Sequence, residues 1–366
     1  MEYCQKNLEK TAQRGEFTGQ IADQRSLGSD HKLMIIGLTG RGAEIFRQAK
    51  AGQFVQISCG NITDGSGINK SGPTLLRRPF SMAGVRREFY RGGIGAKRED
   101  EILGGVQNDK GVDQNDKSGA QNNEGGDEII YVEIIYRLVG PGTNWMAGRG
   151  IGEEINLLGP LGNGFTPPDD RKSKIILAGG GVGLPPLYFW ADQLVEAGYE
   201  NVVGFAGAQG KDLFAGELNK DDYDASEPLQ SQMVIKQWAR SGTCCIAATE
   251  DGSFGFTGSV VEALERFIDA HGDGPETYLY ACGPYGMLKA AAEAAQRRKM
   301  VCQVCMEAYM ACGIGVCQSC AVLVREKPSP ASPHKDGQGT QYKLVCSNGP
   351  VFDAEEVVWE LVKTRR

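Results

Sequence analysis

The sequence predicts a multidomain α+β protein, and three observations predict it. Many short strands separated by Gly and Pro turns over 31–170 indicate an antiparallel β-barrel. Strand–helix alternation over 171–298 indicates a doubly wound α/β domain. Four patterned cysteines within 299–366 indicate a small C-terminal domain built around a metal centre. Residues 1–30 are polar, carry little pattern, and are predicted to form an N-terminal extension.

Within the barrel, apolar and alternating runs mark the strands. Residues 91–127 hold nine glycines, many polar residues and few large apolar groups, so they cannot bury a core and are predicted to be a flexible insertion. The strands are expected at 33–38, 52–57, 129–139 and 156–160.

The α/β domain begins with an apolar run at 174–178 that lacks alternation, as is typical of parallel strands. A helix follows from Pro185 to about Ala197, since proline favours the first helical turn. Ser259 and Glu262 form a capping-box pattern that starts another helix. Further strands are expected at 202–207 and 278–281, and a further helix at 284–298.

The composition excludes several classes of function. The chain has 366 residues and a net charge of −7, without a long basic run, which argues against nucleic acid as a partner. No stretch approaches the roughly 18 apolar residues of a membrane span, so we expect a cytoplasmic protein that does not contact a membrane.

Cys312, Cys317, Cys320 and Cys346 form the most informative pattern. Their C-x4-C-x2-C spacing with one distant fourth cysteine matches the plant-type [2Fe–2S] ligand pattern. Zinc sites usually show paired C-x2-C motifs, so zinc is the weaker alternative. Gly313 and Gly315 allow the loop to turn tightly and to point backbone N–H groups at cluster sulfides.

The other seven of the eleven cysteines show no disulfide framework. Cys302 and Cys305 form a second C-x2-C, but their apolar neighbours indicate a strand and a structural role. Cys282 precedes Gly283 and Pro284 at the carboxyl end of a predicted parallel strand, where α/β sheets bind ligands. Its thiol either borders a nicotinamide or is a small buried group beside a turn.

A glycine-rich turn joins the first parallel strand to its helix and contains Gly179, Gly180, Gly181 and Gly183. Such glycines let the backbone approach a pyrophosphate at a helix N-terminus. The spacing departs from G-x-G-x-x-G, so a tight strand–helix turn remains the alternative.

Two motifs in the barrel suit a flavin nucleotide. Arg78-Pro79-Phe80-Ser81 offers an arginine for phosphate and a fixed backbone that could face a flat heterocycle; a surface basic pair at Arg77 and Arg78 is the alternative. In the second motif a tyrosine could stack on a ring while an arginine and a threonine bind phosphate; a half-buried strand aromatic is the alternative. This motif comprises Ile135, Tyr136, Arg137, Gly142 and Thr143. The three histidines lie in polar contexts, and we assign no catalytic residue.

In this order, the motifs resemble the ferredoxin–NADP reductase superfamily and, within it, the electron transfer subunits of NAD-linked dihydroorotate dehydrogenase B. The resemblance covers about residues 30–366, and its most specific parts are 158–165 and 307–320. The sequence departs from the family pattern in three places: the first 30 residues, the 91–127 insertion, and the long gap from Cys320 to Cys346.

The resemblance implies a role in pyrimidine (UMP) biosynthesis. An FMN-containing partner subunit oxidises dihydroorotate, and electrons pass through [2Fe–2S] and FAD to NAD⁺, in a heterotetramer of two plus two subunits. It implies that the cysteines at 312, 317, 320 and 346 ligate iron. It also implies that FAD binds at 78–81, 135–137 and 142–143, and that the 179–183 loop and Cys282 border the NAD site.

Two other readings remain open on the sequence. One is an iron–sulfur flavoprotein subunit of an NAD(P)H–ferredoxin oxidoreductase or sulfide dehydrogenase, some of which carry aspartate in place of the first cluster cysteine. The other is a non-catalytic zinc-binding module. The choice between NAD and NADP is also open, because Lys211 and Asp212 stand side by side after the second parallel strand.

Overall fold

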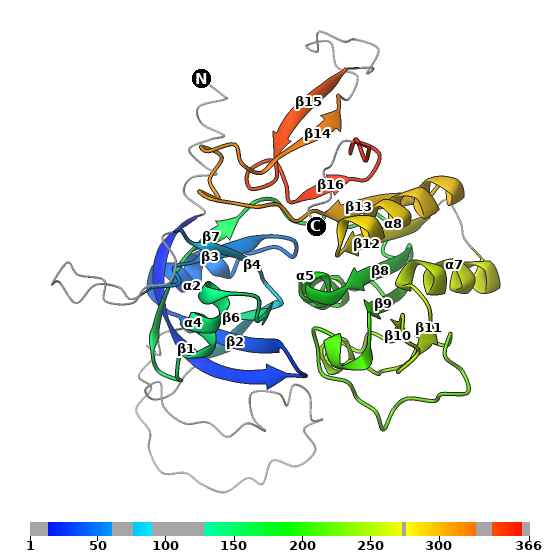
Figure 1. Ribbon diagram of the computed structural model, residues 1–366, viewed down its shortest axis with the longest axis horizontal. Coiled ribbons are helices and arrows are strands. Elements are labelled where there is room, and N and C mark those ends of the chain that lie inside the picture. Colours follow the sequence, from blue (N-terminus) through cyan, green and yellow to red (C-terminus); the bar gives the residue numbers. More distant parts are fainter. Residues whose placement is uncertain (1–13, 61–75, 90–127, 273–275, 327–338, 361–366) are drawn as a thin grey trace, which may run out of the picture.

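The structure is a computed structural model, and it describes residues 14–60, 76–89, 128–272, 276–326 and 339–360. The predicted insertion at 91–127 lies outside the described residues. Figure 1 shows the antiparallel sheet on the left, the α/β domain on the right, and the C-terminal hairpin above the space between them.

The first sheet is antiparallel, with the order β4-β3-β7-β1-β2-β6-β5. Only Met82 and Ala83 separate the two edge strands, β4 and β5, so the sheet must curl until its edges approach one another. Two short helices accompany it, α2 (Gly40–Phe46) and α4 (Pro141–Ala147). The strands are β1 (Gly15–Leu27), β2 (His31–Leu38), β3 (Phe54–Ile57), β4 (Arg78–Ser81), β5 (Gly84–Phe89), β6 (Glu128–Arg137) and β7 (Glu154–Leu161). This curled half-barrel confirms the predicted antiparallel β domain.

One sequence-based boundary is wrong. Residues 15–27 were expected in an N-terminal extension, but β1 pairs with β2 on one side and β7 on the other. The strand is polar along most of its length and only half-buried, so it lacks the alternation that identifies strands from sequence. Its place in the sheet is decided by its two neighbours.

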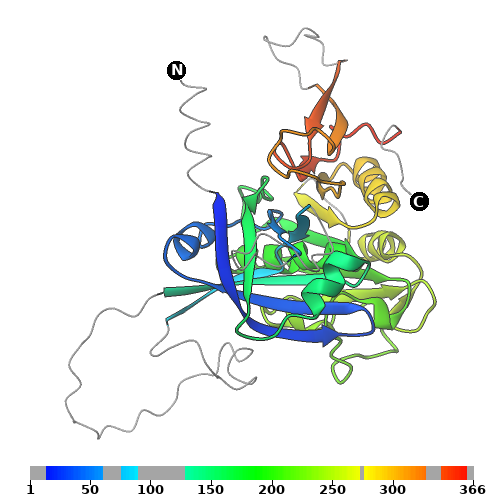
Figure 2. The ribbon, with the colours of Figure 1, turned by 60° about the vertical axis from the view of Figure 1, so that its left-hand side comes forward.

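The second sheet has the order β11-β10-β9-β8-β12-β13-β16 and is parallel except for β16. Its parallel core confirms the predicted doubly wound domain. Helix α5 (Leu184–Glu196) lies on the barrel side of this sheet, and α7 (Val260–His271) and α8 (Tyr285–Arg298) lie on the other (Figures 1 and 2). The remaining elements are β8 (Lys174–Gly180), η1 (Gly181–Gly183), β9 (Val202–Ala208), η2 (Lys211–Leu213), α6 (Lys236–Ala239), β10 (Cys245–Thr249), β11 (Phe256–Thr257), β12 (Thr277–Cys282), β13 (Val301–Cys305) and β16 (Val351–Asp353).

The predicted boundary at residue 299 also needs correction. The sequence assigns 301–305 and 351–353 to the C-terminal domain, but both segments complete the second sheet as β13 and β16. What remains of that domain is the cysteine loop and a hairpin of β14 (Ala321–Arg325) and β15 (Thr340–Leu344). Strand pairing over such sequence separations depends on tertiary packing, which the local pattern does not encode.

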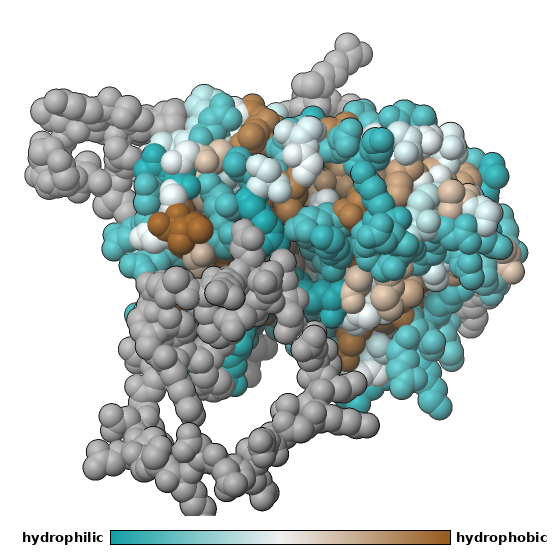
Figure 3. All heavy atoms as spheres, turned by 90° about the horizontal axis from the view of Figure 1, so that it is seen from below, coloured by the Kyte–Doolittle hydropathy of each residue, from teal (hydrophilic) through white to brown (hydrophobic). Residues whose placement is uncertain are grey.

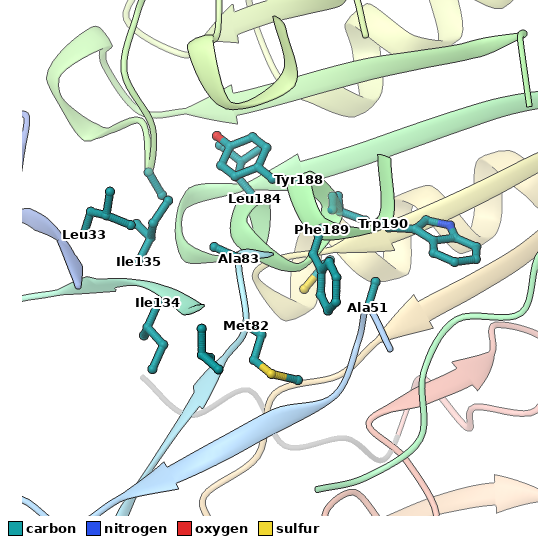
Figure 4. Close-up of a cluster of buried hydrophobic side chains, with 14 of the residues drawn as sticks. Leu33, Ala51, Met82, Ala83, Ile134, Ile135, Leu184, Tyr188, Phe189 and Trp190 are labelled. Atoms are coloured by element: carbon teal, nitrogen blue, oxygen red, sulfur yellow. The ribbon is translucent and has the colours of Figure 1, made fainter. Parts of the chain in front are cut away.

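Two hydrophobic cores hold these parts together. The first extends from the barrel into α5, where Met82 and Ala83 meet Leu184 and Phe189 (Figure 4). The second joins α7 and α8 to the C-terminal segment, including Cys320 and Cys346. The face in Figure 3 is accordingly mostly hydrophilic, with small separate hydrophobic patches.

Among the described helices, none has the length and apolar character needed to span a bilayer.

Candidate functional site

The two predicted flavin motifs meet inside the barrel. Phe80 of β4 and Tyr136 of β6 make an edge-to-face contact with ring centroids 5.9 Å apart. Tyr136 is only 2% exposed, and its hydroxyl lies 3.4 Å from Gln24 Oε1. Burial raises the pKa of Tyr136 well above its ordinary value, so the phenol stays neutral. Phe80, which is half-buried, is the ring of this pair that lies nearer the surface.

Gly142 and Thr143 shape the turn that begins α4. A Cβ on Gly142 would lie 3.3 Å from Arg78 Cγ and 3.5 Å from Cys59 Sγ, so the turn packs directly on β4 and the segment after β3. Thr143 Oγ1 accepts the N–H groups of Val139 (3.0 Å) and Gly140 (3.2 Å). The threonine therefore holds the turn in shape, and the two predicted motifs are adjacent.

The arginines of these motifs differ in how they are held. Arg77 donates to Glu16 Oε1 (2.7 Å) and Asn156 Oδ1 (2.5 Å), and Arg137 donates to Asp30 Oδ2 (2.6 Å). Arg78 donates to backbone carbonyls and has no carboxylate partner among the residues that the structure describes. Its charge is therefore the one most available to a phosphate.

The predicted dinucleotide residues gather at the carboxyl edge of the second sheet. Gly179 at the end of β8 is in register with Cys282 at the end of β12. A Cβ on Gly183 would lie 2.2 Å from the carbonyl oxygen of Cys282, so only glycine allows the loop to pack here. Gly181 has φ +53° and open space beside it, and Gly180 packs against Met287.

Cys282 itself is a buried thiol. Its side chain is hydrogen-bonded to Cys305 of the neighbouring strand, and this contact together with burial raises its pKa well above the ordinary value. The side chain is 7% exposed. A thiol in this state is a poor nucleophile, so any role beside a nicotinamide would be one of packing and shape.

A pocket of about 470 Å³ opens beyond the ends of β9 and β10. Lys211, Asp212 and Asp251 contribute the charges on its lining. Ser253 accepts the backbone N–H of Lys211 at 2.9 Å and donates its own N–H to Asp251 Oδ1 at 2.9 Å, which fixes the pocket wall. Sequence reasoning missed Asp251 and Ser253; their position just after β10 was the available signal.

The four predicted iron ligands form two pairs. Cys317 N donates to Cys312 Sγ at 3.4 Å, and Cys346 N donates to Cys320 Sγ at 3.5 Å. Cys320 and Cys346 are buried at 2% and 3% exposure, whereas Cys317 is exposed. The loop of residues 307–320, here called the cluster loop, therefore contains the half-buried Cys312 and the exposed Cys317, and it ends at the buried Cys320, which pairs with Cys346 beyond the loop.

The donor set of this loop fits a binuclear cluster. Hydrogen bonds from Ser319 and from the Cys312 segment lower the pKa of Cys317 to about 6, which favours the thiolate that iron binds. Gly313 (φ +68°) and Gly315 (φ +85°) take left-handed conformations that let the loop close around a ligand. If the two thiol pairs held such a cluster, they would supply four thiolates, two from each pair.

Gln56 of β3 is a part of the site that sequence reasoning missed. Its side chain is 0% exposed, and neither of its amide atoms has a hydrogen-bond partner among the residues that the structure describes. A Cβ on Gly313 would lie 2.5–2.8 Å from the Gln56 amide atoms, so the cluster loop passes directly over this amide. A polar residue in an otherwise apolar strand was the available signal.

The outer side of the cluster loop carries apolar side chains. Ile314 is 42% exposed, Val316 73% and Tyr309 66%, all within a few residues of the exposed Cys317. Exposed apolar residues concentrated in one loop suit contact with another protein.

Comparisons with known proteins find relatives that share the cluster-binding segment and the overall fold. The family model for the iron–sulfur cluster binding domain of dihydroorotate dehydrogenase B matches residues 307–358. The fold is similar to a solved structure of an NADH-dependent reduced ferredoxin-NADP oxidoreductase, with a TM-score of 0.60 and 22% identity over 94% of this chain and 92% of that one.

Among the curated relatives is the dihydroorotate dehydrogenase B (NAD(+)) electron transfer subunit of Geobacillus kaustophilus, 38% identical over 62% of this chain and 73% of its own length. That of Desulforamulus reducens is 30% identical over 87% of this chain and 90% of its own length. With a match of this extent, the chain belongs to the family of dihydroorotate dehydrogenase B electron transfer subunits.

Proposed function

We propose that this chain accepts electrons from an FMN-containing, dihydroorotate-oxidising partner subunit and delivers them to NAD⁺ in pyrimidine (UMP) biosynthesis. When bound, the [2Fe–2S] cluster supplies one-electron transfer and FAD couples it to hydride transfer. The observation that carries the proposal is the contact between the cluster loop and the barrel strands: Gly313 lies against Gln56, whose strand β3 pairs with the flavin motif of β4.

The residues of the barrel would bind and orient FAD. Arg78 supplies the available positive charge for the pyrophosphate, and Pro79 fixes the backbone of β4. Phe80 and Ser81 extend along the same strand, and the turn formed by Gly142 and Thr143 packs against it. Ile135, Tyr136 and Arg137 support the strand from β6; Arg137 is held by Asp30 and needs to leave it to contact phosphate.

The second sheet would hold the dinucleotide at its carboxyl edge. Gly179, Gly180, Gly181 and Gly183 form the loop there, and Cys282 closes its inner side. In the adjoining pocket the carboxylates of Asp212 and Asp251 suit ribose hydroxyls and would repel a 2′-phosphate. Two carboxylates against the one ammonium group of Lys211 favour NAD over NADP in this pocket.

The partner subunit would dock on the outer side of the cluster loop. Ile314, Val316 and Tyr309 offer apolar contact area there, beside the exposed Cys317. We propose a cytoplasmic heterotetramer of two chains of each kind.

Co-purification with the partner tests the proposal. The chain, co-expressed with a dihydroorotate-oxidising FMN subunit and purified without oxygen, should hold about two irons and one FAD. The complex should reduce NAD⁺ with dihydroorotate as donor, and the isolated partner should not. A colourless protein carrying zinc and no flavin would overturn the assignment. A coloured complex that reduces ferredoxin but ignores dihydroorotate would instead support the NAD(P)H–ferredoxin oxidoreductase reading.

A further inference from the structure

Strand β3 has two faces with different surroundings. Val55 and Ile57 point into the barrel core, and both are fully buried. Because side chains alternate along a strand, Phe54 and Gln56 point the other way, and Phe54 belongs to the core that also contains Cys320 and Cys346. Gln56 is therefore a buried polar side chain on the barrel face that meets the cluster domain.

The position of Gln56 is costly unless something pairs with it. Its amide carries two N–H donors and a carbonyl acceptor, all buried, and burial of such groups without hydrogen bonds is unfavourable. An apolar residue of similar size would pack in the strand without this cost. A buried amide at this position therefore indicates a partner other than the residues that the structure describes.

The neighbours of the amide identify the chemistry of that partner. Gly313, which lies over the amide, directly follows the predicted iron ligand Cys312. A bound [2Fe–2S] cluster would bring sulfide and thiolate sulfur atoms to this loop, and these sulfurs accept hydrogen bonds. Across the sheet, Gln56 is in register with Pro79 of the flavin motif, so one residue contacts the loop and adjoins the flavin strand.

We propose that Gln56 Nε2 donates a hydrogen bond to a sulfur atom of the cluster, either a bridging sulfide or the Cys312 thiolate. Gln56 thereby holds the cluster loop against the barrel and tunes the reduction potential of the cluster. A donor to sulfur stabilises the more negative, reduced state, so the side chain raises the midpoint potential. The inference rests on the proposed function only in requiring a [2Fe–2S] cluster at these four cysteines.

The first experiment uses the wild-type complex with ¹⁵N-labelled glutamine side chains. After reduction, pulsed electron paramagnetic resonance should detect one coupled amide nitrogen and its exchangeable protons. The Gln56→Met variant, which keeps the length and removes the amide, should lose both couplings. Its cluster should retain the iron content of the wild type and show a lower midpoint potential.

A matched control separates this effect from general destabilisation. Gln237→Met removes another buried amide, whose Oε1 accepts the Glu217 N–H at 2.9 Å in the α/β domain. This variant should lose stability but keep the cluster couplings and potential unchanged.

The outcomes also separate the two proposals. No coupled glutamine nitrogen in a wild-type protein that holds the cluster would overturn the role of Gln56 and leave the proposed function intact. This readout holds even where Gln56→Met does not fold. An unchanged potential in a folded, fully loaded Gln56→Met variant would overturn it as well. A wild-type protein without any cluster would instead sink the proposed function.

Discussion

The barrel makes two contacts of opposite character with the rest of the chain. Toward the α/β domain, Arg240 bridges Glu133 of β6 (3.2 Å) and Asp192 of α5 (2.8 Å), and Arg86 pairs with the same Glu133 (2.5 Å). We call this the ion-pair junction. Toward the cluster loop, Gln56 contacts Gly313, and its amide has no hydrogen-bond partner within the described part of the chain. We call this the cluster junction.

The two junctions differ in whether protein side chains alone satisfy their buried polar groups. In the ion-pair junction every buried charge has a partner from the chain, and Gln193 of α5 adds hydrogen bonds to Ala49 O (3.1 Å) and from Ala51 N (2.9 Å). The cluster junction has four thiols and an amide whose partner would be the cluster. We therefore expect the first junction to form on folding and the second to become complete on cluster insertion.

The largest expected effect comes from removing a cluster ligand. Cys312→Ala should abolish dihydroorotate-driven NAD⁺ reduction by the complex, because one iron loses a thiolate and the cluster is lost. The ion-pair junction should remain, so FAD content and NADH oxidation by an artificial dye should persist. Iron analysis and the two assays check this, and simultaneous loss of FAD would show that the junctions are not independent.

Arg240→Met should break the ion-pair junction. It leaves Glu133, 3% exposed, without its ion pair to Arg240, and it removes the ion pair of Asp192 as well. Breaking a buried ion pair on one side typically costs about 3–5 kcal/mol. Chemical denaturation of the cluster-loaded protein measures this loss. Arg240→Lys, which keeps the charge, should lose clearly less, and equal losses would mean that charge is not the cause.

Gly313→Ala should disturb the cluster junction by steric contact. The new methyl group would meet the Gln56 amide at 2.5 Å, in a backbone conformation of φ +68° that alanine adopts only with strain. We expect a loss on the order of 1–3 kcal/mol, with reduced iron content.

Gly152→Ala is the matched control for this variant, because Gly152 has φ +84° and nothing within 4 Å of the added methyl group. It should show the backbone strain alone and keep full iron content. If the two variants lose equal stability and equal iron, the contact with Gln56 has no role.

The last expected effect is a pH dependence of the ion-pair junction. Burial, followed by the charge of Glu133, raises the pKa of Asp192 from 3.8 to about 7, although Arg240 is close by. A raised carboxyl pKa gives stability that is present below the unfolded value near 3.8 and is lost as the pH rises through about 7.

Asp192→Asn should remove this loss, which is at most about 4 kcal/mol for a shift of about three pKa units, because the Arg240 guanidinium 2.8 Å away favours the charged form. Thermal unfolding of both proteins between these pH values measures it. Parallel pH profiles would show that Asp192 is charged throughout.

Much of the fold could be predicted from local patterns. The helix expected from Pro185 to Ala197 is α5, and the capping residue Ser259 accepts the N–H of Glu262 at the start of α7, as its pattern indicates. The half-buried polar strand β1 and the pairing of β13 with β16 could not be predicted, because neither leaves a periodic signal.

The candidate site divides in the same way. Cysteine spacing predicts Cys312, Cys317 and Cys320 as iron ligands with Cys346 as the distant fourth, because a plant-type cluster uses this spacing, and the assignment stays a prediction. The cysteine spacing gave no indication that the buried Cys282 thiol is hydrogen-bonded to Cys305 of the neighbouring strand β13.

By itself, the sequence determined the order of the motifs and the elements with strong periodicity, and it predicts the ligand chemistry of the cluster loop, because these depend on residues close together in the chain. Only the tertiary structure decided that β3 lies under the cluster loop, that Gln56 meets Gly313, and that Arg240 ties α5 to the barrel. These contacts join segments far apart in sequence. The physical reason is that such contacts depend on the complementary shape and polarity of whole surfaces, which form only when the chain has folded.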